Sequence, residues 1–335
     1  MKNQEINFLN LPNNTRPESD YKPDFQETIN QEFIKASEKY GNLINLVDSR
    51  YQSPESTLAN SPEQLKSFKE HNDQVLKLCI QRGLEKGLSQ QEIDQLEIAA
   101  ILHDIAKADK PLGNKAKIDN YILAAHGEIA AEQLPDILNN QPEILTKLLG
   151  DNYSAEDYLL VLNKIQDALR CHMGPHPGFM DFILTNVNKQ LAELGQPLIE
   201  HKRPKNGDKV AEILLAADMY SLADRQGREK ILAIRLAVPF FQQQDSILCA
   251  EYNKLGINLT MGEAALLSGF DSADQAKYTV QDNDDQAWID QAIEKSKNGD
   301  YKYGDEVINY QQAIAKRTNY LLSCQKIKQK SVEAA

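Results

Sequence analysis

The sequence predicts an all-α protein with a bundle-like core. Apolar residues recur at intervals of three and four through much of the chain, which is the spacing of one helix face. Stretches in which apolar and polar residues alternate, as they do in half-buried strands, are scarce. Ser61 and Ser89 stand directly before two of the periodic segments, where a serine can cap a helix.

Length and composition narrow the class of protein. The chain has 335 residues, of which 41% are hydrophobic and 26% charged, as in ordinary globular proteins with one large or two smaller domains. Its formal net charge of −12 argues against general nucleic-acid binding, which needs a basic face. A small phosphorylated molecule is still compatible with this charge, because a bound metal can dominate the local field.

The positions of the cysteines and the length of the apolar runs indicate in which cellular compartment the protein is expected. The four cysteines are far apart, which suits a reducing environment. No apolar run has the length of a signal peptide or of a membrane span. We therefore expect a cytoplasmic protein that does not enter a membrane, although a specialised secretion route would leave no such sign. The sequence does not indicate an oligomeric state.

The helices are expected in the following order. Residues 1–60 are polar and predict a loosely structured N-terminal arm with one helix over residues 26–40. The central region, residues 61–235, carries five expected helices: residues 61–84 with a capping box at the start, 89 to before Pro111, 118–134 ending at Pro135, 155–171, and 208–222. Residues 236–335 predict a helical C-terminal extension whose last helix spans residues 305–327.

The histidines are the strongest functional signal. Five of the six lie between residues 71 and 176, and four fall on or at the end of apolar helix faces: His71, His103, His126 and His172. A single buried histidine is more often a hydrogen-bonded core residue than a metal ligand. Four of them, together with Asp104 and Asp218 on similar faces, favour a metal site instead. Imidazole and carboxylate ligands suit transition metals, and a carboxylate can bridge two ions.

The order of these residues resembles that of the HD superfamily of metal-dependent phosphohydrolases. Five segments are similar to the family's ligand-bearing helices: EHNDQVLKLC, AAILHDIAK, AHGEIAAEQL, KIQDALRCHMG and LLAADMYSLAD. The resemblance covers residues 62–230 and implies an HD-type helical bundle over the central region, with the arm and the extension outside it. The presence of the third and fourth histidines implies the two-metal subset.

The resemblance also implies how the metals are held. Asp104 would bridge two divalent ions, with His71, His103 and Asp218 on one ion and His126 and His172 on the other. Fe, Mn or Co are the expected ions, and Zn, Ni or Mg are alternatives. A hydroxide bridging the two ions would be the nucleophile.

Four further residues are candidates for substrate contact or catalysis. Lys107 shares the face of the His–Asp pair and would neutralise phosphate charge in the transition state; the alternative is a lysine that complements a helix end. His176, in a Pro/Gly loop, is either a substrate contact and proton donor or an exposed loop residue. Arg225 and Arg228 could bind phosphates, although such residues are more often solvated.

The resemblance narrows the reaction further. The segment CHMGPHPGFMD is most similar to the small two-metal hydrolases that split diadenosine tetraphosphate symmetrically. The Gly-Tyr-Pro signature of the cyclic-di-GMP branch is absent. We therefore expect hydrolysis of a phosphoester or phosphoanhydride bond in a small nucleotide-like substrate. A di-iron oxygenase of the same superfamily and a catalytically silent regulatory or binding module remain alternatives.

Overall fold

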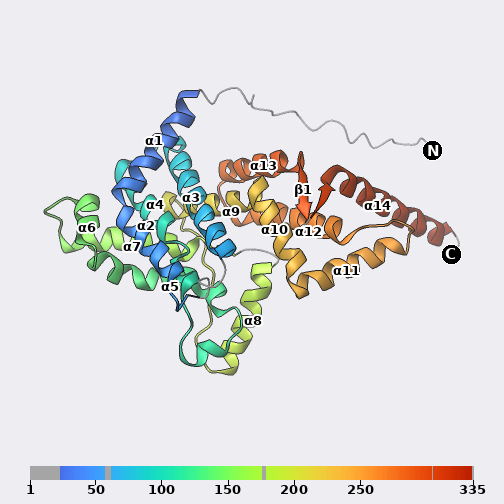
Figure 1. The fold of residues 1–335 in the computed structure, drawn as a ribbon, viewed down its shortest axis with the longest axis horizontal. Coiled ribbons are helices and arrows are strands. Elements are labelled where there is room, and N and C mark those ends of the chain that lie inside the picture. Colours follow the sequence, from blue (N-terminus) through green and yellow to red (C-terminus); the bar gives the residue numbers. More distant parts are fainter. Residues whose placement is uncertain (1–22, 57–61, 176–178, 304, 334–335) are drawn as a thin grey trace.

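The computed structural model describes residues 23–56, 62–175, 179–303 and 305–333. In these ranges the chain forms fourteen α-helices, three short 3₁₀ helices and one two-stranded sheet (Figure 1). The predicted all-α class is confirmed. None of the described helices is long and apolar enough to span a bilayer.

The N-terminal region contributes a helix that the sequence analysis missed. Helix α1 (Pro23–Lys39) matches the expected helix, but α2 (Gly41–Gln52) follows it directly. Leu43, Val47 and Tyr51 are spaced by four residues, are buried, and pack in the same core as α3 and α4. The expectation of loose structure outside the first helix is therefore wrong for residues 41–52. A short stripe of three apolar residues among polar ones was too weak a signal for a helix.

The central region is a bundle in which α9 is surrounded by other helices. Its elements are α3 (Pro62–Glu85), α4 (Gln90–Leu102), the 3₁₀ helices η1 (Ile105–Ala108) and η2 (Gly113–Lys117), α5 (Tyr121–Asn139), α6 (Pro142–Leu149), α7 (Ala155–Cys171), α8 (Phe179–Glu193) and α9 (Lys209–Ala223). The five expected helices are all present, and α7 has the expected bounds. Helices α6 and α8 were not predicted.

Helix α5 continues through Pro135, where the sequence analysis expected it to end. A proline has no N–H, so the carbonyl of Ala131, four residues earlier, loses its usual helical partner. The side chain of Gln166 on α7 replaces it, because its Nε2 donates to Ala131 O at 2.8 Å. A contact between two helices thus satisfies the carbonyl that would otherwise disfavour a proline at this position.

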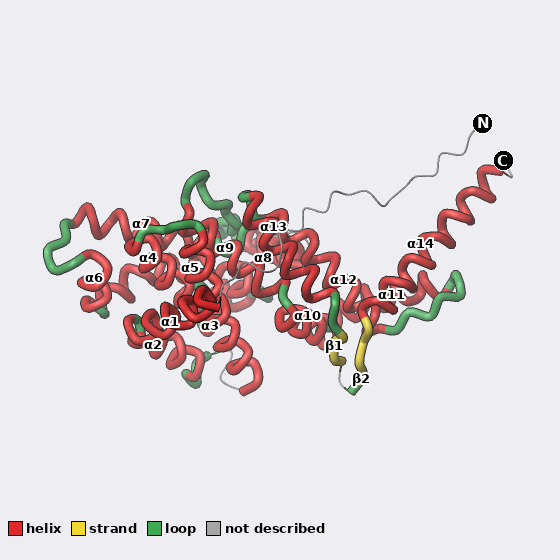
Figure 2. Tube along the Cα trace, turned by 90° about the horizontal axis from the view of Figure 1, so that it is seen from above, coloured by secondary structure: helices red, strands yellow, loops and turns green. Residues whose placement is uncertain are grey.

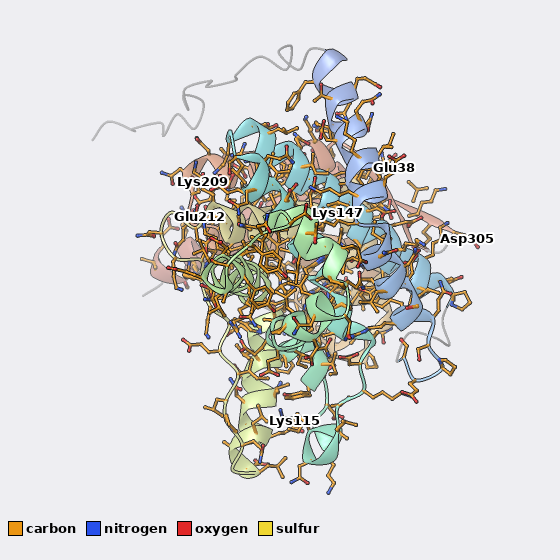
Figure 3. All side chains as sticks on the ribbon, turned by 90° about the vertical axis from the view of Figure 1, so that its left-hand side faces the viewer. Glu38, Lys115, Lys147, Lys209, Glu212 and Asp305 are labelled. Atoms are coloured by element: carbon orange, nitrogen blue, oxygen red, sulfur yellow. The ribbon has the colours of Figure 1, made fainter. Side chains whose placement is uncertain are left out.

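Helix α6 is fixed to the end of α1 by a surface contact. Lys147 Nζ donates to the backbone carbonyl of Lys39 at 2.6 Å. Lys147 and the exposed Glu38 both lie on the end of the molecule that faces the viewer in Figure 3. The N-terminal helices therefore pack on the bundle and are held there by both apolar and polar contacts.

The C-terminal region is helical apart from a short hairpin. It comprises α10 (Arg225–Ala237), α11 (Pro239–Asn253), α12 (Met261–Ala276), η3 (Lys277–Thr279), α13 (Asn283–Lys297), β1 (Asp300–Tyr303), β2 (Glu306–Asn309) and α14 (Tyr310–Glu333). The strands are antiparallel, with Asp300 opposite Asn309. The expected last helix begins at residue 310 instead of 305, because residues 306–309 pair with β1.

Helix α9 is shared by two hydrophobic cores. Leu214 and Ala217 pack in the first, with α1 to α7, whereas Leu215 and Met219 pack in the second, with α10 to α14. In Figure 2, α9 lies between these two groups of helices, and α14 extends away from the second. Asp218 therefore lies on the helix where the two cores meet. The division at residues 60 and 235 stays a prediction.

Candidate metal centre

The bundle brings together all six predicted metal ligands. His71 lies within α3, His126 within α5 and Asp218 within α9, while His103 and His172 are the C-cap residues directly after α4 and α7. Asp104 follows His103 and begins η1. All six are buried, and four are fully inaccessible: His103, Asp104, His126 and His172.

The backbone sets the orientation of three of these histidines. In each, Nδ1 lies at hydrogen-bond distance from the carbonyl oxygen three residues earlier: His103 to Ala100 at 2.7 Å, His126 to Leu123 at 2.9 Å, and His172 to Leu169 at 2.7 Å. A carbonyl oxygen can only accept, so Nδ1 must carry the hydrogen. In the neutral ring Nε2 is then left without one, with its lone pair directed into the centre.

His71 reaches the same tautomer through a serine. Its Nδ1 lies 3.3 Å from Ser221 Oγ, and that hydroxyl donates to the carbonyl of Asp218 at 2.7 Å. The hydroxyl hydrogen is already used, so Ser221 accepts from His71 Nδ1. The Nε2 atom of His71 lies 3.3 Å from Asp218 Oδ1. Ser221 was not identified from the sequence, although its position one helical turn after Asp218 was a usable signal.

The Nε2 atoms approach one another closely. His126 and His172 place theirs 3.0 Å apart, and His71 and His103 place theirs 3.3 Å apart. Burial lowers the pKa of His103 and His126, and it lowers that of His172 to about 3. At neutral pH, therefore, neither His126 nor His172 carries an additional proton on Nε2 that the other could accept. Opposed lone pairs are stable in this arrangement when a cation lies between them.

Asp104 faces both pairs of histidines, one with each oxygen. Its Oδ1 lies 3.3 Å from His126 Nε2 and 3.8 Å from His172 Nε2. Its Oδ2 lies 3.6 Å from the Nε2 atoms of both His71 and His103. Among the described residues no donor satisfies the buried Oδ1. Two groups of potential ligands thus share Asp104, and their donor types fit two divalent ions.

The two carboxylates of the centre stay ionised. Burial alone would raise the pKa of Asp104, but the neighbouring His103, Lys107 and His126 outweigh it and hold that pKa well below its usual range. The pKa of Asp218 is likewise lowered, because contacts with His71 outweigh burial. Anionic oxygens surrounded by imidazole nitrogens are suited to binding cations.

The structure places Lys107 at the centre. Its Nζ forms an ion pair with Asp104 Oδ2 at 2.6 Å, and its side chain remains 20% exposed. A cation therefore lies beside the bridging position and is still accessible to a ligand. His176, the other predicted catalytic residue, lies outside the described residues.

The structure does not bring the two predicted arginines to the centre. Arg228 is buried, donates from Nη1 to the carbonyl of Gly269 at 2.6 Å, and lies over the ring of Phe270. It holds α10 against α12. Arg225 donates from Nη2 to the carbonyl of Asp300 at 2.9 Å and so fixes the hairpin. Neither is among the residues that line the pocket beside His71.

Two residues near the centre were not identified from the sequence. Tyr51 on α2 donates its hydroxyl to the carbonyl of Asp104 at 3.0 Å. Lys230 on α10 lines a pocket of about 160 Å³ that also borders His71. Tyr51 lies in the segment taken for a loose arm, and Lys230 is one of many lysines. No local pattern distinguishes either of them.

Comparison with known proteins agrees with this geometry. Residues 68–225 match the family model described as HD domain. Neither the curated proteins nor the solved structures gave a match. The matched segment extends from α3 to α9 and contains all six predicted ligands. This match and the buried His/Asp cluster together fit the HD superfamily.

Proposed function

We propose that this chain is a metal-dependent phosphohydrolase that acts on a phosphoester or phosphoanhydride bond of a small nucleotide-like substrate. The observation that carries the proposal is the position of Asp104, whose two oxygens each face the Nε2 atoms of a separate pair of histidines. The HD domain match supports it, because that family consists mostly of metal-dependent hydrolases.

The residues present would hold two ions in different ways. His71, His103 and Asp218 would hold one ion, and His126 and His172 would hold the other, with Asp104 between them. Two divalent ions at such a site supply an activated water and polarise the phosphoryl oxygen. Fe, Mn or Co suit this mixture of imidazole and carboxylate.

The residues of the chain would carry out the remaining functions. The ammonium of Lys107 lies beside Asp104 Oδ2 and would donate to a phosphoryl oxygen as negative charge develops on it. The Nδ1 hydrogen bonds keep the imidazoles in one orientation, so little reorganisation would accompany the reaction. A substrate like a dinucleoside polyphosphate is suggested by the similarity of residues 171–181 to the enzymes that split diadenosine tetraphosphate.

The test is metal content followed by hydrolysis without oxygen. Wild-type protein should contain about two equivalents of Mn²⁺ or Fe²⁺ and should hydrolyse a phosphodiester or dinucleoside polyphosphate anaerobically. Asp104→Ala should lose metal and activity but keep its helical circular dichroism. Asp94→Asn is the matched control. Asp94 is another buried carboxylate on α4, but it pairs with Lys39 and is not part of the His/Asp cluster.

Three outcomes would contradict the proposal. Full metal content and activity in Asp104→Ala would exclude the metal centre described above. Oxygen consumption by the iron form, with no phosphate-bond hydrolysis, would assign the chain to the oxygenases instead. Absence of bound metal under all conditions would leave a binding or regulatory module.

A further inference from the structure

A pocket beside the metal centre contains a lysine from outside the matched family segment. The pocket has a volume of about 160 Å³ and is lined by His71, Gln74 and Ser221 on one side and by Gln226 and Lys230 on the other. His71 belongs to the ligand cluster, so the pocket and the centre share a wall. Lys230 lies beyond residue 225, where the HD domain match ends.

Lys230 shares an aromatic ring with Lys107. Its Nζ lies 5.3 Å from the centroid of the Phe68 ring, and the Nζ of Lys107 lies 5.6 Å from the same centroid. Cations are stabilised over an aromatic face, so Phe68 keeps both ammonium groups near the centre. Two lysines, one from η1 and one from α10, thus converge on a residue of α3.

The two lysines differ in whether they form an ion pair with a carboxylate. Lys107 pairs with Asp104, whereas Lys230 has no ion pair or hydrogen bond within the described part of the chain. Lys230 is nevertheless half-buried. Burial and the nearby charge of Lys107 lower the pKa of Lys230, and the negative charges of Asp104 and Asp218, with which it forms no ion pair, offset this only in part. The only carboxylate among the pocket's lining residues, Glu70, lies 3.7 Å from Lys66.

Local packing fixes the position of Lys230. Asp224 caps α10 by accepting from the N–H of Gly227 at 2.8 Å, and Gln74 on α3 donates its side-chain amide to the other oxygen of Asp224. A Cβ at Gly227 would lie 2.2 Å from the carbonyl oxygen of Ser221, so the start of α10 lies directly against α9. Lys230 follows less than one helical turn later. Its place on the pocket wall is thus set by the backbone.

We propose that Lys230, supported by Phe68, binds a second phosphate group of the substrate next to the one at the metal centre. The inference rests on the proposed function and narrows its substrate class to compounds with at least two linked phosphates. A phosphate oxygen is an acceptor that an unpaired ammonium binds strongly in a partly buried site. A substrate with a single phosphate would leave Lys230 without a partner.

The experiment compares a diphosphate analogue with inorganic phosphate as inhibitors of the Mn²⁺ holoenzyme. Hydrolysis of bis(4-nitrophenyl) phosphate, which has one phosphate, reports the inhibition. In Lys230→Met the inhibition constant of methylenediphosphonate should rise by about tenfold or more, because a charged hydrogen bond is lost. The inhibition constant of phosphate and kcat/KM for the one-phosphate substrate should change by less than about twofold.

Two variants control for charge and for folding. Lys77→Met removes a lysine that also lies over a phenylalanine ring, Phe33, but on an exposed part of α3, and it should leave every constant unchanged. Lys230→Arg keeps the charge and should retain most of the affinity for methylenediphosphonate. It also remains informative if the methionine variant fails to fold.

The outcomes separate this inference from the proposed function. An unchanged constant for methylenediphosphonate in Lys230→Met, or an equal rise for phosphate, would overturn the second site. If the wild type hydrolyses no phosphate ester, the proposed function fails. In that case the second phosphate site is tested by calorimetry, which measures the affinity of methylenediphosphonate for the metal-loaded wild type and for Lys230→Met. A difference in affinity of about tenfold would support the site, and equal affinities would overturn it.

Discussion

Each histidine of the centre is oriented by a hydrogen bond that does not depend on metal. Three use the carbonyl oxygen three residues earlier, and His71 uses the hydroxyl of Ser221. Outer contacts of this kind fix the tautomer and increase the affinity for metal. Since the carbonyls belong to the helices themselves, only the contact of His71 can be removed by a side-chain substitution.

Ser221→Ala should therefore weaken metal binding without affecting the fold. The affinity of the ion held by His71 is expected to fall by roughly 10–100-fold, the usual effect of losing an outer hydrogen bond to a histidine ligand. Titration of the metal-free protein with Mn²⁺ measures it. Ser296→Ala is the matched control, because Ser296 is buried and also donates to a carbonyl three residues earlier, that of Ile293, at 2.8 Å. Equal affinities for wild type and Ser221→Ala would contradict this role.

The clustering of the candidate ligands could be predicted from the sequence, but the residues around them could not. Four histidines on or at the end of apolar faces are unusual enough to indicate a shared site, and the structure brings all of them to Asp104. Lys230 and Tyr51 reach the centre only through the packing of α10 and α2. Arg228 shows the converse, because the sequence allowed either a phosphate contact or a solvated side chain, and the residue is instead buried against α12.

At the level of helices, the geometry of the group formed by Asp104, His126 and His172 depends on how closely α5 approaches α7. Gly127, next to His126, is a position where the two helices approach closely. A Cβ there would lie 2.7 Å from the carbonyl oxygen of Leu169 and 3.1 Å from Cε1 of His172. That carbonyl is the one that accepts from His172 Nδ1. Helix separation and ligand orientation are thus set by the same contact.

Gly127→Ala should lower both stability and metal content. The steric cost, about 1–3 kcal/mol, outweighs the gain of about 1 kcal/mol that alanine brings within a helix. Calorimetric unfolding and elemental analysis measure the two effects. Gly83→Ala is the control, because a Cβ in α3 would have Leu96 as its nearest neighbour at 3.4 Å, an ordinary contact. If Gly127→Ala were as stable and as metal-loaded as Gly83→Ala, the close approach would not matter.

The sequence predicts helices well where a cap and an apolar stripe occur together. Helix α4 illustrates this at its start, because the predicted cap Ser89 accepts from the backbone N–H of Glu92 and the helix begins at Gln90. Predicted helix boundaries are wrong where a contact with a residue distant in the sequence determines where the helix begins or ends. Gln166 allows α5 to pass Pro135, and pairing with β1 delays the start of α14. Helix α2 is stable because its few apolar residues are covered by the core, which local spacing does not reveal.

On the scale of the whole molecule, buried titratable groups make stability depend on pH in opposite directions. Burial and the charge of Asp94 raise the pKa of Glu97 to about 8. The folded protein thus binds more protons than the unfolded chain between pH 4.5 and 8, and stability falls as the pH rises through this range. The metal-free histidines, whose pKa values are lowered, act oppositely and destabilise the fold as the pH falls below 6.5.

Glu97→Gln should remove the fall in stability that Glu97 causes between pH 4.5 and 8. At pH 8 the variant is expected to melt on the order of 5 °C above the wild type, and the difference should shrink toward pH 4.5, where Glu97 is protonated. Melting curves across this range measure it. Glu92→Gln is the control, since Glu92 lies on the same helix, caps it and has a lowered pKa, so its loss brings no gain at pH 8. An equal or lower melting temperature for Glu97→Gln at pH 8 would refute the prediction.

The position of α9 between the two cores has a consequence for how the molecule opens. Neither core can separate from α9 without exposing apolar side chains such as Leu214 on one face or Leu215 on the other. Local fluctuations that expose outer helices such as α6 or α14 would leave α9 covered. Its amide hydrogens should therefore be among the slowest in the chain to exchange for deuterium. Asp218 would keep its place through partial openings at either end.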